Sequence, residues 1–102
     1  MTLNFEKKSF HIVVIDSGKV DYGLVLEKIV KNGMMDYSRF TIHVLSNHET
    51  PFHLEKLRSI IQNNIAYTLI IRYHKLTENN VKEVLNEAKD KPHEIIGNFK
   101  VK

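Results

Sequence analysis

The chain contains no cysteine, and this absence removes three kinds of chemistry at once. Disulfide bonds, thiolate nucleophiles and thiolate metal ligands are all excluded. A cysteine-free composition also suits a reducing compartment. The first ten residues carry charges but no apolar run of signal-peptide length. We therefore expect a cytoplasmic protein.

Long apolar runs and blocks of like charge are missing as well. No apolar run approaches the roughly 20 residues that a membrane-spanning helix needs, so we expect no membrane association. The net charge is +3, yet Lys7 and Lys8 form the only adjacent basic pair. Because a nucleic-acid surface predicts a stripe of Lys and Arg with interleaved aromatics, nucleic-acid binding is the weakest function that we consider.

What is present indicates one small globular domain over residues 1–102. The hydrophobic fraction of 42% and the charged fraction of 26% are close to globular averages. Residues 1–8 are polar, with Leu3 and Phe5 alternating, which fits a loose arm or a short edge strand. We expect the rest of the chain to form a compact core.

Four segments have the pattern of strands. Two are apolar on both faces, as in strands covered on both sides, and we place them at the centre of a sheet: His11–Ile15 and Ala66–Tyr73. Phe40–Leu45 alternates between apolar and polar residues, which predicts a half-exposed edge strand. The fourth predicted strand is His93–Val101.

Three segments between these strands repeat apolar residues at helical spacing: Tyr22–Asn32, Phe52–Asn63 and Leu76–Asp90. Asp21, Thr50 and Thr77 are predicted N-caps, and Gly33 is predicted to end the first helix with a positive φ. The resulting order is β-α-β-α-β-α-β, which predicts a three-layer α/β domain with a mainly parallel four-stranded sheet. With the most apolar strands central, the expected strand order is 2-1-3-4.

In an open parallel sheet, ligands bind beyond the carboxyl ends of the strands, where the strand order reverses. Three predicted loops lie at that edge: Asp16–Asp21, Ser46–Thr50 and Tyr73–Leu76. Together they supply the candidate ligand-binding residues, which are Asp16, Ser17, Gly18, Lys19, His48, His74 and Lys75. We identify no complete catalytic set and no metal or cofactor site among them.

Each candidate has a structural alternative. Asp16 either binds a ligand or caps backbone N–H groups in its own turn. Ser17–Lys19 could cradle a small anion, but a single glycine makes neither G-x-G-x-x-G nor a P-loop. His74 is either a general acid–base group or an exposed loop residue. His11 and His43 lie within predicted strands, so we interpret them as packed or edge residues rather than ligands.

One motif and four later segments follow one another along the chain: Val14-Ile15-Asp16-Ser17-Gly18, His43–Leu45, Ile60–Ile71, Val84–Lys91 and Ile95–Asn98. The motif resembles the aspartate motif of the subtilases, the subtilisin-type serine proteases, and the later segments resemble parts of the same family in the same order. The resemblance implies that Asp16 holds the place of the catalytic aspartate and Asn98 that of the oxyanion-hole asparagine. It covers residues 10–98 with generous gaps.

The chain departs from the subtilase pattern at the other catalytic positions. Gly33–Arg39 contains no histidine where the family has Gly-His-Gly-Thr, and no Gly-Thr-Ser-Met-Ala segment occurs in the 102 residues. A Ser–His–Asp mechanism requires the base and the nucleophile in contact. The resemblance therefore implies a trimmed, non-proteolytic core.

The sequence leaves two main functional hypotheses. The first is a non-enzymatic binding module of the accessory, immunity or inhibitor type, which binds a protein partner or a second copy of itself through an exposed strand edge. The alternative is an enzyme for a small molecule or anion that uses the loops Asp16–Asp21 and Tyr73–Leu76. In that alternative Asp16 is the base or ligand, Lys19 or Lys75 neutralises an anion, and His74 moves a proton.

Overall fold

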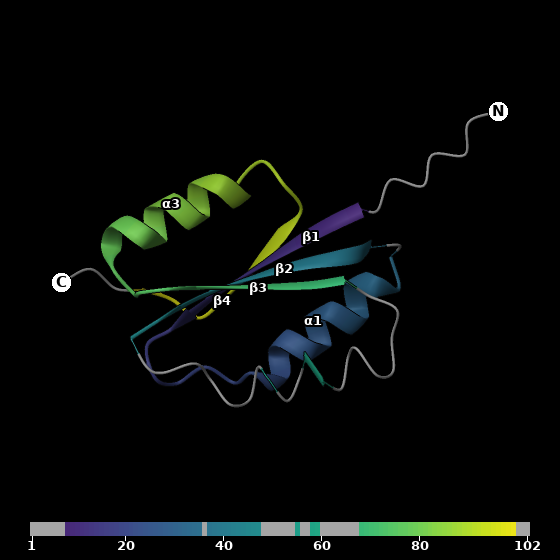
Figure 1. Cartoon of the computed structure of the whole chain (residues 1–102), viewed down its shortest axis with the longest axis horizontal. Coiled ribbons are helices and arrows are strands. Elements are labelled where there is room, and N and C mark those ends of the chain that lie inside the picture. Colours follow the sequence, from purple (N-terminus) through teal and green to yellow (C-terminus); the bar gives the residue numbers. More distant parts are fainter. Residues whose placement is uncertain (1–7, 36, 48–54, 56–57, 60–67, 100–102) are drawn as a thin grey trace.

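The computed structural model describes residues 8–35, 37–47, 55, 58–59 and 68–99, and it has an α/β architecture (Figure 1). One parallel sheet in the order β3-β2-β1-β4 lies between two helices, which confirms the expected fold class. The strands are β1 (Lys8–Asp16), β2 (Tyr37–Ser46), β3 (Thr68–His74) and β4 (His93–Ile96), and the helices are α1 (Gly23–Gly33) and α3 (Glu78–Ala88). Within these described ranges, no helix is both long and apolar enough to cross a membrane.

Strand β1 is the centre of the molecule. It is buried from Phe10 to Asp16, and it pairs with β2 along its whole length and with β4 over four residues. Its even-numbered side chains pack towards α1 and its odd-numbered apolar ones towards α3, as the two-residue period of a strand requires. The sheet therefore has a core on each face, and Figure 1 shows α1 and α3 on opposite sides of it.

The predicted strand order 2-1-3-4 is wrong, because β2 is an interior strand and β3 is at the edge. Phe40–Leu45 is buried on both faces, although its alternation predicted one exposed face. The residues that misled the prediction are Thr41 and His43, which are polar and yet lie under the α3 face, 7% and 0% exposed. A neutral histidine can be buried when its ring nitrogens bond to another side chain.

The ends of two predicted elements also differ. Gly33 is the last residue of α1 and is not among the positive-φ glycines of the described residues, so the predicted left-handed end is wrong. The helix instead ends with the Met34 N–H donating to the Val30 carbonyl at 3.2 Å. Strand β4 ends at Ile96 rather than Val101, because Gly97 adopts a φ of 88° and turns the chain.

Helix α3 starts where its sequence predicts. The Thr77 hydroxyl accepts the Asn80 N–H at 3.1 Å, and Val81, Val84 and Ala88 form the buried face. Asp21 accepts the Gly23 N–H at 2.8 Å, although the N-cap position of α1 is Tyr22. The second predicted helix and its Thr50 cap lie outside the described residues, apart from Glu55, Arg58 and Ser59, which are helical.

Gly97 provides a direct test of how β1 and β4 fit together. A Cβ atom at this residue would lie 2.2 Å from the Ile15 carbonyl oxygen. We expect Gly97→Ala to lower the free energy of unfolding by roughly 2–4 kcal/mol, because the left-handed backbone and the overlap both penalise the methyl group. Urea denaturation followed by circular dichroism measures the change.

Gly23→Ala is the matched control. Gly23 has no positive φ, and the atoms nearest to an added Cβ belong to the exposed Asp21 side chain, the first at 3.0 Å. We expect a change within about 0.5 kcal/mol. Equal losses in the two variants would contradict the close approach of Gly97 to β1.

Candidate functional site

Asp16 ends β1 at the carboxyl edge of the sheet, and both of its oxygens are occupied locally. Its Oδ1 accepts the Gly18 N–H at 2.8 Å, and its Oδ2 accepts the Tyr22 hydroxyl at 2.5 Å. The side chain is 7% exposed, and Gly18 adopts the positive φ of 110° that this turn requires. Asp16 therefore stabilises the connection between β1 and α1.

The phenol of Tyr22 is the buried partner of this carboxylate. Burial raises the pKa of Tyr22 above its ordinary value of 10, and the hydrogen bond to the Asp16 carboxylate raises it further. Tyr22 therefore keeps its proton and remains a hydrogen-bond donor at pH 7.

The neighbouring residues do not complete an anion site. Ser17, Gly18 and Lys19 are exposed, but the Gly18 N–H that could bind an anion already donates to Asp16. The adjacent carboxylate also repels negative charge. Lys75 is exposed at the far side of the same edge, and His48 lies outside the described residues.

Asn47 joins the ends of β2 and β3. Its Oδ1 accepts the Leu76 N–H at 3.1 Å and its Nδ2 donates to the Leu76 carbonyl at 3.5 Å. Asn80 also donates to the Lys75 carbonyl, at 2.9 Å. Sequence reasoning missed Asn47. The only available signal was an amide directly after a strand, a common place for side chains that bond to backbone.

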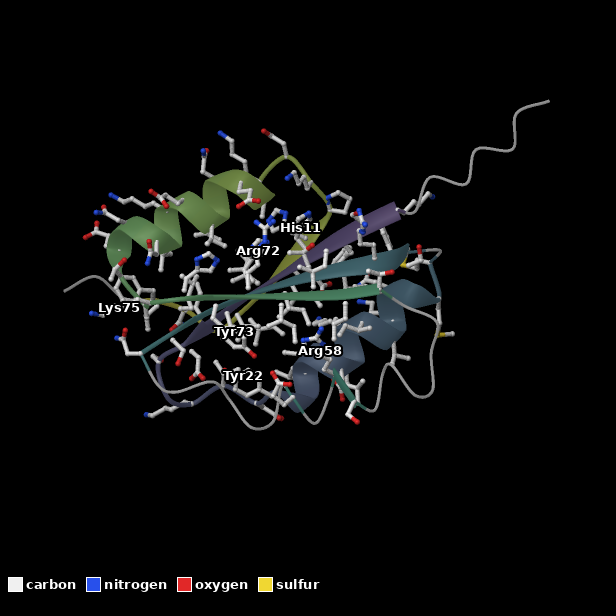
Figure 2. The ribbon with its side chains drawn as sticks, viewed as in Figure 1. His11, Tyr22, Arg58, Arg72, Tyr73 and Lys75 are labelled. Carbon is white, nitrogen blue, oxygen red and sulfur yellow. The ribbon has the colours of Figure 1, made fainter. Side chains whose placement is uncertain are left out.

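The structure separates Asp16 from His74. The Asp16 side chain bonds to Tyr22 on the α1 side, whereas His74 stacks against His43 on the α3 side, and β2 lies between their strands. Figure 2 shows the same division, with Tyr22 and Tyr73 on one side of the sheet and His11 and Arg72 on the other. Asp16 and His74 therefore do not form one acid–base centre.

The observed strand order also moves the place where a ligand is expected. The order 3-2-1-4 reverses between β1 and β4, so the loop after β3 is two strands away from Asp16. At the reversal, Gly97 lies against the Ile15 carbonyl and the Val20 side chain. The backbone of Gly97 and Ile15 therefore fills the space between the ends of β1 and β4.

Three histidines from adjacent strands stack across the α3 face, and we call His11, His43 and His74 the histidine row. His11 Nδ1 and His43 Nε2 are 3.1 Å apart, at hydrogen-bond distance. The ring centroids of His11 and His43 are 5.4 Å apart, and those of His43 and His74 are 6.1 Å apart. Within the described residues, His43 Nδ1 and His74 Nε2 are buried without a hydrogen-bond partner.

Burial favours the neutral form of His11 and His43 at pH 7. It lowers the pKa of His11 from the ordinary 6.5, and it lowers the pKa of His43 to about 4. The charge of Glu87 opposes the shift at both rings. The stacked rings do not converge on a point, and no group of three or more His, Asp or Glu residues in the described ranges is arranged to hold a metal ion.

No known protein family, curated protein or solved structure matched the chain. A functional interpretation therefore depends on the geometry described above. Asp16 ends β1 and Asn98 lies just after the neighbouring strand β4, and the resemblance to subtilases stays a prediction.

Tyr22→Phe tests whether the Asp16 turn is structural. The variant leaves one oxygen of a buried carboxylate without its donor, so we expect a loss of about 1.5–3 kcal/mol in the free energy of unfolding at pH 7. Because the folded pKa of Tyr22 is raised, the native protein should also lose stability as the pH rises above about 10. In urea denaturation, the variant should lack the part of this alkaline loss of stability that comes from Tyr22.

Tyr37→Phe serves as the control. Tyr37 packs its ring edge-on against Phe10, at a centroid distance of 5.1 Å, and phenylalanine keeps that contact. We expect it to retain the alkaline loss of stability seen in the native protein. If Tyr22→Phe has the same free energy of unfolding as this control at pH 7 and also above pH 10, the role assigned to the Asp16–Tyr22 bond is wrong.

Proposed function

We propose that this protein is a non-enzymatic interaction module that binds another protein chain along the outer edge of β3. The observation that carries this proposal is the open edge itself. β3 is the first strand in the sheet order, and within the described residues no strand pairs with its outer side. Every second residue of such a strand directs its N–H and C=O outwards, where an extended segment of a partner can pair with them.

The side chains of β3 suit a contact surface. Tyr73 is 42% exposed on the α1 side, and the Arg72 side chain is 54% exposed on the α3 side. Tyrosine and arginine are enriched at the centres of protein interfaces, because they combine apolar area with hydrogen-bonding groups. Glu55 and Arg58 lie close enough to Tyr73 to influence its charge environment, so both signs of charge flank the strand.

The opposite edge of the sheet is less suited to binding. β4 has four residues compared with seven in β3, and Gly97 turns the chain away immediately after it. Its Glu94 forms an ion pair with Lys28 of α1 at 3.2 Å. β4 therefore offers fewer backbone groups to a partner.

The contacts at the carboxyl edge favour binding over catalysis. An enzyme needs its base and acid in one place, but Asp16 is engaged by its own turn and His74 lies on the other face. The loops after β2 and β3 are hydrogen-bonded to each other, because the Asn47 side chain bonds to the Leu76 backbone. Of the residues predicted for an enzyme site, Asp16 thus has structural partners and lies apart from His74.

Tyr73→Lys tests the proposal, with Ile95→Lys as its matched control. Both residues are large, apolar and on edge strands, and they are 42% and 47% exposed. A lysine blunts an edge strand against pairing. We expect Tyr73→Lys to weaken a partner complex, or self-association, by tenfold or more, which corresponds to at least about 1.4 kcal/mol.

Sedimentation of the purified chain measures self-association, and affinity capture from cells with the three chains as bait identifies a partner. Hydrogen exchange should then show the β3 amides protected in the complex and not in the free protein. The proposal is contradicted if the chain is monomeric and captures nothing. It is equally contradicted if both lysine variants bind as the native chain does, or if only Ile95→Lys loses binding.

A further inference from the structure

The histidine row places titratable side chains in the interior of the protein. His43 has no solvent exposure and His11 only 8%, and the two side chains form a hydrogen bond to one another. Their one mutual bond, between His11 Nδ1 and His43 Nε2, contains a single proton. If both rings became positively charged, both facing nitrogens would carry hydrogens and the bond would be lost. The pair therefore fits the fold only while it is at most singly charged.

The charged groups around the row are not arranged to neutralise added protons. On β3, Arg72 lies beside the row, and after α3 Lys91 adds a second positive charge. His93 of β4 pairs in register with His11 and is a further titratable neighbour. Among the described residues, the one carboxylate acting on both rings is Glu87 of α3, which already pairs with Arg72 at 3.4 Å.

We propose that the histidine row is a pH-sensitive latch, in which proton uptake by His11 and His43 loosens α3 from the sheet in mildly acidic solution. His43 Nδ1 is buried without a partner in the described part of the chain, so a proton there needs water that α3 now excludes. When α3 moves away from the sheet, water reaches the rings. The positive charges are then solvated and no longer lie in a low-dielectric interior. This proposal does not rest on the proposed function.

Helix α3 is the layer that should respond first. The buried cluster on its side contains Val13, Ile15, Leu45 and three residues of α3 itself. The cluster on the α1 side is larger and includes three aromatic side chains, Phe10, Tyr22 and Phe40. The least stable unit of a protein opens before the whole. The strand pairing between β1 and β2 should therefore persist when α3 opens.

The direction of the pH dependence follows from the lowered pKa values. In the open state His43 titrates near 6.5, and in the closed state near 4. The closed state is therefore fully favoured above pH 6.5 and loses stability as the pH falls towards 4. Between pH 7.5 and 5.5, this single residue should increase the opening of α3 about tenfold, and His11 adds to that factor.

Amide hydrogen exchange by NMR, with EDTA present and intrinsic rates corrected, tests the latch in the full chain. We expect the protection factors of α3 to fall at least tenfold between pH 7.5 and 5.5, while those in the β1–β2 ladder change less than twofold. His43→Leu should remove most of that difference, since leucine fills the site without titrating. His93→Gln should retain it, because the His93 ring already bonds to the Lys91 carbonyl at 2.7 Å.

A second measurement decides the question if His43→Leu fails to fold. Ring-proton titration of the native protein should give a pKa for His43 well below the ordinary value of 6.5. The proposal is overturned if His43 titrates near 6.5 or if α3 protection does not depend on pH. It is also overturned if His43→Leu keeps the full pH dependence, or if the β1–β2 ladder loses protection in step with α3.

Discussion

The structure depends on the parallel ladder between β1 and β2. Nine residues of β1 pair with β2, from Lys8 with Tyr37 to Asp16 with Ser46. Once this register is set, the two-residue period decides which side chains face α1 and which face α3. A one-residue slip would exchange the phenylalanines of one core with the histidines of the other. The ladder thus fixes both cores and the position of every polar group discussed above.

Parts of this architecture could be predicted from the sequence, because they depend on neighbouring residues. The apolar run of β1 is long enough to identify a buried strand, and Thr77 identifies the start of α3 through its own hydroxyl. The alternation of strands and helices along the chain predicts that helices cover both faces of the sheet. These features need no knowledge of distant contacts.

The order of the strands and the environment of the polar residues could not be predicted in the same way. His43 has the pattern of a solvent-facing residue in Phe40–Leu45, whereas in the structure its buried ring contacts His11 on the next strand. Likewise, the sequence leaves open whether Asp16 binds a ligand or caps its own turn, and the bonds from Gly18 and Tyr22 decide for the turn. Such pairings are made in space, so a single sequence contains no direct sign of them.

The contacts of Asn47 give α3 a preferred direction of movement. Two hydrogen bonds tie Asn47 to Leu76, just ahead of the helix, so the N-terminal end of α3 is attached to the end of β2. A helix fixed at one end moves as an arm about that end, and its C-terminal turn travels furthest. That turn continues into β4, whose preceding Pro92 carbonyl accepts the His11 N–H at 3.0 Å. An opening of α3 of the kind proposed above would therefore pull on β4, the shortest strand of the sheet, and that edge of the domain would move with the helix.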